Sequence, residues 1–330
     1  MTAPLGMIDK ALSLTAWTVC AGLFLTVGWT ALQPDDPLGA VSLWSQQHGL
    51  MAWVQTAVLG GAVAAVGTLL IGRRLPDAGI FAAALGLAAV NLRGSHAGSL
   101  LIGYPHAQGG SPAALSGILV LETLGWFAVI VGAALVSGTI YRWCFQRQEP
   151  SSSDEAADST PPDAGHAMIL SEIRAPMASS DSSSAAARPG WVQGIKQLAV
   201  TLAVAMVVLR LLSVGAVPRA LSHGQVYFTV ATAFYVGVIA GVYQFPTPSA
   251  LWGCLAVPLL ACIGYLVVWI GSGGAAGQAQ ASHIPASMFL RALPLTYISV
   301  GTAAVMAAFW FTLRWPRTAP STSQSSRRRH

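Results

Sequence analysis

Long apolar stretches alternate with short polar segments along most of this chain. A helix that crosses a bilayer needs about 20 predominantly apolar residues. We predict transmembrane helices over residues 11–32, 50–71, 78–102, 113–140, 197–217, 225–245, 250–271 and 288–313. Helices are expected rather than an open sheet because lipid offers no hydrogen-bond partner for exposed backbone groups. The predicted fold is therefore an all-α, polytopic membrane helix bundle with eight transmembrane helices.

The third stretch is the least regular of the eight. Its apolar core ends near Val90, and Asn91, Arg93 and His96 follow. The helix either stops early or continues with these polar groups facing the bundle interior.

A segment over 148–190, rich in Ser, Ala, Pro and Asp, interrupts the apolar pattern. Such a composition cannot bury enough apolar surface to offset the entropy lost on ordering. We therefore predict a disordered cytoplasmic linker between a first four-helix half, residues 1–147, and a second, residues 191–317. A disordered basic tail is predicted over 318–330.

The two halves share a dipeptide where their second helices begin, His48-Gly49 and His223-Gly224. In each half, proline follows in the next inner turn. These matches are explained either by chance or by an internal repeat of four helices, as many transporters contain.

The composition agrees with a membrane protein: 54% of the residues are hydrophobic and 9% are charged, against about 25% charged in an ordinary soluble domain. The net charge of +5 would also suit a nucleic-acid binder. The basic residues, however, flank the helices mainly on one side, as the positive-inside rule requires of cytoplasmic segments. We expect both termini in the cytoplasm, in a bacterial inner membrane. The expected partners are the lipid bilayer and other membrane subunits, with no nucleic acid.

Five of the seven histidines map to the outer side of the predicted bundle: His48, His96, His106, His223 and His283. A neutral imidazole nitrogen binds haem iron or copper well. His48 and His223 are predicted at similar depth, where two rings could face one porphyrin from opposite sides. The alternative is that each is an ordinary histidine of a loop or membrane interface.

Residues 47–72 read QHGLMAWVQTAVLGGAVAAVGTLLIG. This stretch resembles the second helix of haem-copper oxidase subunit I and of its nitric-oxide-reductase relatives. In that family a histidine at the start of the helix ligates the low-spin haem, and His48 occupies the matching position. The resemblance implies a haem b site that contains His48.

A second patch, residues 223–228, resembles the copper-ligand helix of the same family, with His223 at the copper histidine. Gly224 and Gln225 replace the proline and glutamate of that motif. The later helix ends in VWIGSG, over 268–273, where the family has adjacent copper histidines. These departures argue against copper and against a complete oxygen-reducing centre.

Two charged residues, Glu122 and Arg210, fall inside predicted helices, about 10–14 Å below the outer surface at 1.5 Å per residue. Charged groups inside lipid are costly and often functional. The two could form a buried pair. Alternatively, Arg210 with Arg291 or Arg93 could hold haem propionates, because a guanidinium matches the fork of a carboxylate.

Three functions are compatible with these features. The first is a haem-binding redox or electron-relay protein, the second a membrane transporter, and the third a non-catalytic assembly or scaffold subunit. The sequence contains no P-loop, nucleophile elbow, zinc-protease or dinucleotide motif, so no enzyme class is predicted.

Overall fold

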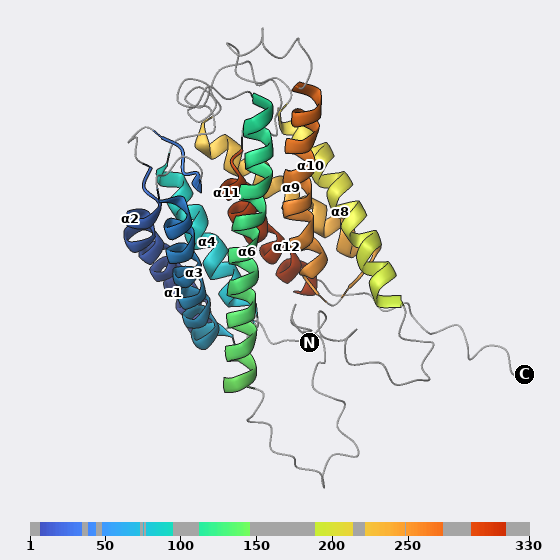
Figure 1. The fold of residues 1–330 in the computed structure, drawn as a ribbon. Helices are drawn as coiled ribbons and strands as arrows, with labels where there is room; N and C mark the ends of the chain where they lie inside the picture. The colour runs from blue at the N-terminus through green and yellow to red at the C-terminus, as the bar shows by residue number, and fades with distance from the viewer. Residues whose placement is uncertain are drawn as a thin grey trace, which may run out of the picture.

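The computed structural model is an all-α bundle in which successive helices run alternately up and down (Figure 1). It describes residues 7–34, 39–43, 48–72, 75, 77–94, 112–145, 189–213, 222–247, 249–272 and 292–314. The first span is α1 (Met7–Leu23), the π-helix η1 (Phe24–Gly28) and α2 (Trp29–Leu32). There follow α3 (Gly49–Ile71), α4 (Ala78–Arg93), α6 (Pro112–Cys144), α8 (Pro189–Ser213), α9 (His223–Gln244) and α10 (Leu251–Ser272). The last span is α11 (Pro294–Thr296), the π-helix η6 (Tyr297–Gly301) and α12 (Thr302–Arg314).

Each of the eight predicted stretches corresponds to one of these helical segments. Seven of them are long and apolar enough to cross a membrane, so the chain is an integral, multi-pass membrane protein. The exception is α4, which has 16 residues and a length of about 24 Å, shorter than a hydrocarbon core of about 30 Å. The third predicted helix thus stops early, at Arg93. The predicted linker ends too late, because Pro189 and Gly190 already belong to α8. The rest of the linker and the basic tail lie outside the described ranges.

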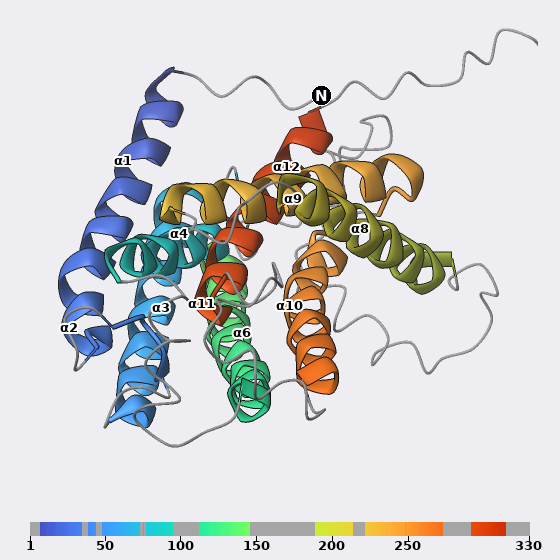
Figure 2. The same ribbon diagram turned by 90° about the horizontal axis from the view of Figure 1, so that it is seen from above.

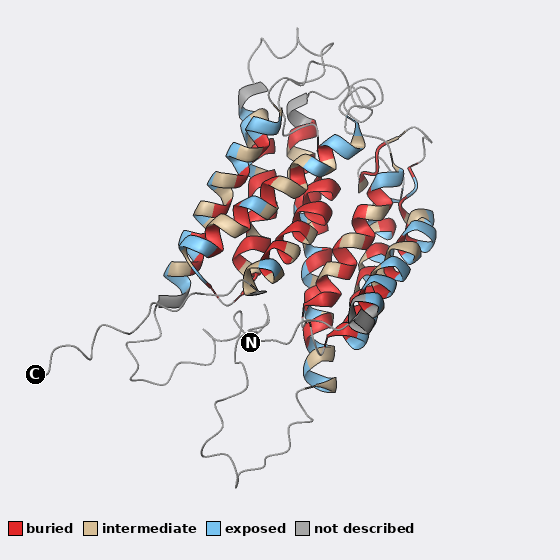
Figure 3. Cartoon of the chain, turned by 180° about the vertical axis from the view of Figure 1, so that it is seen from behind, coloured by how far each residue is buried: buried red, intermediate tan, exposed pale blue. Residues whose placement is uncertain are grey.

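Exposed residues line the outward faces of the long helices (Figure 3), and many of them are large and apolar. Leu50 is 77% and Ile270 78% exposed, which would be unfavourable in water. In a membrane protein such side chains contact lipid tails, so this exposure indicates a surface that lies in the bilayer.

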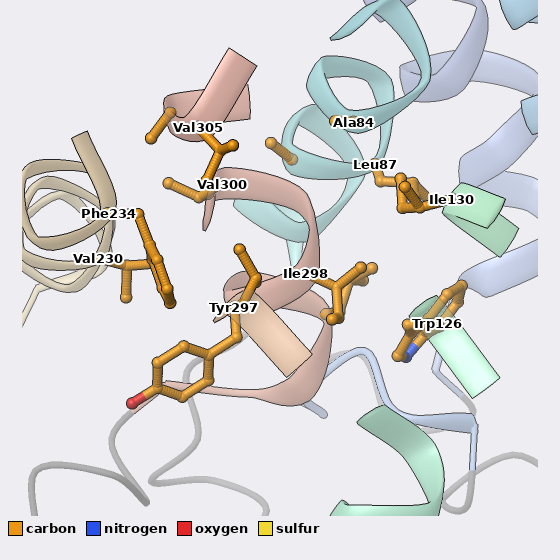
Figure 4. Close-up of a cluster of buried hydrophobic side chains, with 14 of the residues drawn as sticks. Ala84, Leu87, Trp126, Ile130, Val230, Phe234, Tyr297, Ile298, Val300 and Val305 are labelled. Atoms are coloured by element: carbon orange, nitrogen blue, oxygen red, sulfur yellow. The ribbon is translucent and has the colours of Figure 1, made fainter. Parts of the chain in front are cut away.

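The last span occupies the centre of the bundle, with α4, α6, α9 and α10 around it (Figure 2). Every residue from 292 to 302 is buried, as expected of a helix that is apolar on all sides. In Figure 4, Ile298 points toward Trp126 and Ile130 of α6, whereas Tyr297 lies on the side of Val230 and Phe234 of α9. The last span therefore connects α4 and α6 of the first half with α9 and α10 of the second half.

Small residues permit the closest helix contacts. Gly237 and Gly241 lie one turn apart on α9 and pack against α8, where a Cβ at Gly241 would be 2.5 Å from Thr201 Oγ1. On the other side of the bundle, the ring of Phe24 occupies the space that a side chain at Gly86 would need. In lipid, such close packing replaces the hydrophobic effect as the main source of helix association.

We expect Gly241→Val to weaken the pairing of α8 with α9, because the added methyl groups have no space. Overpacking of this kind costs about 1–3 kcal/mol. The matched control is Gly224→Val, at the start of α9, where an added Cβ would meet nothing within 4 Å. Thermal unfolding in detergent should show a lower midpoint for Gly241→Val than for the control; equal midpoints would contradict this packing.

Candidate functional site

A buried carboxyl group lies in the outer half of the bundle. By "outer" we mean the end opposite to the start of α1 and the ends of α6 and α12 (Figure 1). Glu122 is the only aspartate or glutamate in the eight predicted spans. It lies ten residues, or about 15 Å, along α6 from Pro112, and it is 6% exposed.

Three neutral donors converge on this carboxyl. The Ser42 hydroxyl lies 2.7 Å from Oε2, while the Leu43 backbone N–H and the Trp126 indole N–H donate to Oε1 at 3.1 and 3.0 Å. Trp126 is one helical turn further along α6 and is fully buried. Among the described residues, the hydrogen-bond partners of Glu122 are all uncharged.

Two of the donors belong to residues 39–43, which we call the outer segment. This segment is not helical, yet Ala40, Val41 and Ser42 are at most 2% exposed. Irregular backbone at membrane depth is tolerated only where protein or water satisfies its polar groups. Glu122 does so for the N–H of Leu43, and it thereby fixes the segment to α6.

Two glycines leave room for the outer segment. The carbonyl oxygen of Leu43 lies where a Cβ at Gly49 would be, and Val41 packs in the same way against Gly94 at the end of α4. Gly224 has no such neighbour. The glycines of the two His-Gly pairs are therefore not explained by the same contact.

A layer of uncharged polar groups continues from Glu122 across the bundle. Asn91 of α4 donates to Thr296 Oγ1 of α11 at 2.7 Å, and the Tyr227 hydroxyl of α9 donates to the carbonyl of Ala88 at 3.2 Å. These bonds tie α4 to the second half of the chain. Asn91 is 2% exposed, and its Oδ1 has no hydrogen-bond partner among the described residues.

Helix α10 connects this layer to the inner end. The hydroxyl of Tyr265 donates to the carbonyl of Ala292 at 2.7 Å, and its ring packs edge-on against Tyr297. Tyr265 also lies within electrostatic range of Glu122, and Cys254 within range of Asp77, the residue that precedes α4. Asp77 is 7% exposed. The described part of the chain thus contains two buried carboxyl groups, both in the first half.

Two opposing free-energy contributions to the ionisation of Glu122, the loss of hydration and the hydrogen bonds from its donors, are of similar size. Removing an ionised carboxyl from water costs several kcal/mol after relaxation. Hydrogen bonds to a charged group each contribute about 1.5–3 kcal/mol, so three of them offset much of that cost. Small movements of the donors can therefore change whether Glu122 carries a proton.

The structure does not bring the predicted haem ligands together. His48 precedes α3 and is exposed, whereas His223 begins α9 and is half-buried, with its ring centroid 6.5 Å from that of Tyr227. Helix α4 lies between α3 and α9 (Figure 2). His96, His106, His283 and Arg291 lie outside the described residues.

The proposed pair of Glu122 and Arg210 is not formed. Arg210 lies on an exposed face of α8, between Val207 and Leu211, and α8 packs on α9 and α10. Its position three residues before the end of the helix lets the guanidinium reach the lipid headgroups. Arg93, also exposed, donates to the carbonyl of Leu25 at 3.0 Å and lies over the ring of Trp29.

Sequence reasoning identified Glu122 but not its partners. Ser42 and Leu43 belong to an outer loop in the sequence, and Tyr265 is one aromatic residue among many in apolar helices. Their roles follow from contacts between distant parts of the chain. Among the described residues, no cluster of three or more His, Cys, Asp or Glu side chains could hold a metal ion.

No protein-family model, curated protein or solved structure matches this chain. The resemblance to haem-copper oxidase subunit I therefore rests on the two sequence patches described above.

We expect Glu122→Leu to destabilise the protein, because it leaves the buried N–H groups of Leu43 and Trp126 without acceptors. Each such loss costs about 1–3 kcal/mol. Glu122→Gln retains an acceptor oxygen and should be closer to wild type. Thermal unfolding in detergent checks this order; a Leu variant as stable as the Gln variant would show that these bonds contribute nothing.

Proposed function

We propose that this protein is a proton-coupled membrane transporter, in which Glu122 carries the coupling proton. The observation that supports the proposal is a buried carboxyl whose described hydrogen-bond partners are all neutral donors, beside the contact between the two halves. Ionisable groups inside membranes usually belong to proton or substrate pathways.

The seam between the halves is the surface at which we propose that movement occurs. It is formed where α10 packs on α6, and where α4 packs on η6 and α12. In each contact, the third helix of one half meets the fourth helix of the other, as two related repeats would do. Transporters built from such repeats move one repeat against the other around a central site.

The orientation that we propose places both termini in the cytoplasm of a bacterium, with Glu122 nearer the external side. In support, Lys10, Arg142, Lys196 and Arg314 all lie near helix ends at the inner end of the bundle (Figure 1). Basic residues gather on the cytoplasmic side of membrane proteins.

In the present conformation Glu122 and Asp77 are both buried, as in an occluded state. Alternating access requires that the inner end of the seam open to water in another state. Cys254 is a convenient reporter of that opening, because it is a free cysteine of α10 that is 5% exposed.

A variant that keeps Cys254 as its only cysteine should react with a membrane-impermeant thiol reagent applied from the inner side. Reaction should be slow but should not require unfolding. The control keeps only Cys20, which is buried in the first span and should stay protected. If Cys254 remains as unreactive as Cys20 until the protein is denatured, the seam does not open and the transporter proposal fails.

The second candidate is a haem-binding redox protein, in which His48 or His223 binds alone. The exposed ring of His48 at the outer end of α3 favours it. If the protein binds haem in this way, we expect a Soret band after expression with sufficient haem, and we expect His48→Ala or His223→Ala to reduce that band. His166→Ala, within the predicted linker, is the control. A spectrum without a Soret band would exclude the redox function and leave the transporter and the scaffold subunit.

A further inference from the structure

We propose that the proton on Glu122 controls the closure of the outer side: the ionised carboxyl holds the outer segment against α6, and proton uptake from outside releases it. This inference rests on the proposed transporter function but concerns a separate property, the access to the seam from the outer end.

The geometry of the carboxyl suits this role. Its two oxygens accept from Ser42 and Leu43 of the outer segment, and from Trp126 of α6 itself. The first two bonds cross from α6 to the segment, while the third positions the acid. A carboxylate accepts such bonds roughly twice as strongly as a neutral acid does, so protonation weakens the attachment of the segment.

The hydroxyl of Ser42 can form a hydrogen bond with Glu122 in both the ionised and the protonated form of the acid. A hydroxyl can donate to the ionised carboxylate, and it can turn to accept from the protonated acid. Neither change requires movement of the backbone at the moment of proton transfer. A proton that arrives at Oε2 therefore reverses one hydrogen bond and weakens the bond from Leu43 N–H.

Few other titratable groups act on this site. Among the helices packed against α6, α11 contains none, and α3 is preceded by the exposed His48, beside Gly49 and the outer segment. Helix α4 contributes only Arg93, which is bound to Leu25 at the outer surface. The remaining ones are Tyr265, Cys254 and Cys262 of α10, and Tyr297 of η6, which packs on Tyr265. In these described elements Glu122 is the only carboxyl group.

The outer segment has the features of a closing element. Its three central residues are buried without being part of a helix, and it packs into space left by Gly49 and Gly94. Ala40 also contacts Leu293, just before α11. The segment therefore contacts both halves at the outer end of the seam, and under the proposal its release gives access to the seam there.

The test places a cysteine in the segment of a chain without its four native cysteines. Val41→Cys is suitable because cysteine is smaller than valine and Val41 is fully buried. An impermeant thiol reagent is added outside reconstituted vesicles at neutral and at acidic pH. Each rate is divided by that of Gly224→Cys, an exposed outer position, to remove the pH dependence of the thiol reaction.

We expect the normalised rate at Val41→Cys to rise roughly tenfold on acidification, which corresponds to about 1.4 kcal/mol. With Glu122→Gln, which imitates the protonated acid, the rate should be high at both pH values. With Trp126→Phe, which keeps the acid, the pH dependence should remain. A wild-type rate that does not change with pH, or a pH dependence that survives Glu122→Gln, would overturn the proposal.

Ala40→Cys, at a second buried position of the segment, replaces Val41→Cys if that variant does not fold. The result is separable from the transporter test. If Cys254 never reacts from the inner side while labelling of the segment follows pH, the transporter proposal fails and the control by Glu122 stands. If Cys254 reacts and labelling of the outer segment does not change with pH, the transporter proposal stands and the control by Glu122 fails.

Discussion

The hydrogen bonds between Glu122 and the outer segment are the interaction on which the outer half of this bundle depends. A carboxyl at this depth is costly, and so is irregular backbone. Here the carboxyl group and the irregular backbone supply hydrogen bonds to each other. The N–H of Leu43 donates to Glu122, and the carboxyl accepts from three donors in all. Since the described partners of the carboxyl are all uncharged, we propose that this contact at the outer end is sensitive to a proton.

The rest of the fold places this contact beside a central, fully enclosed span. Glycines on α4 and α9 let neighbouring elements approach closely, and the last span fills the middle of the bundle, where it meets helices of both halves. Polar side chains such as Asn91 and Tyr265 join the halves across this centre. The function that we propose depends on a seam with uncharged polar side chains and two buried carboxyl groups, Glu122 and Asp77.

The class of the protein and the bounds of most helices could be predicted from the sequence, because long apolar runs are a direct consequence of the bilayer's thickness. The early end of α4 was one of two alternatives that the polar residues after Val90 left open. Contacts between distant segments could not be predicted. Arg210 appeared to be a partner for Glu122 by depth alone, but depth does not specify the direction in which a side chain points. The two His-Gly pairs looked equivalent, yet Gly49 and Gly224 have different surroundings, and α4 separates the helices that they begin.

The most direct test of this account is the infrared difference spectrum of the reconstituted protein between acidic and alkaline pH, recorded for wild type and for Glu122→Gln. A carboxyl group that gains a proton in an apolar site produces a C=O band distinct from those of exposed acids. The account predicts such a band in the wild type and its loss in Glu122→Gln. Identical difference spectra for the two proteins would show that Glu122 does not exchange its proton and would contradict the central claim.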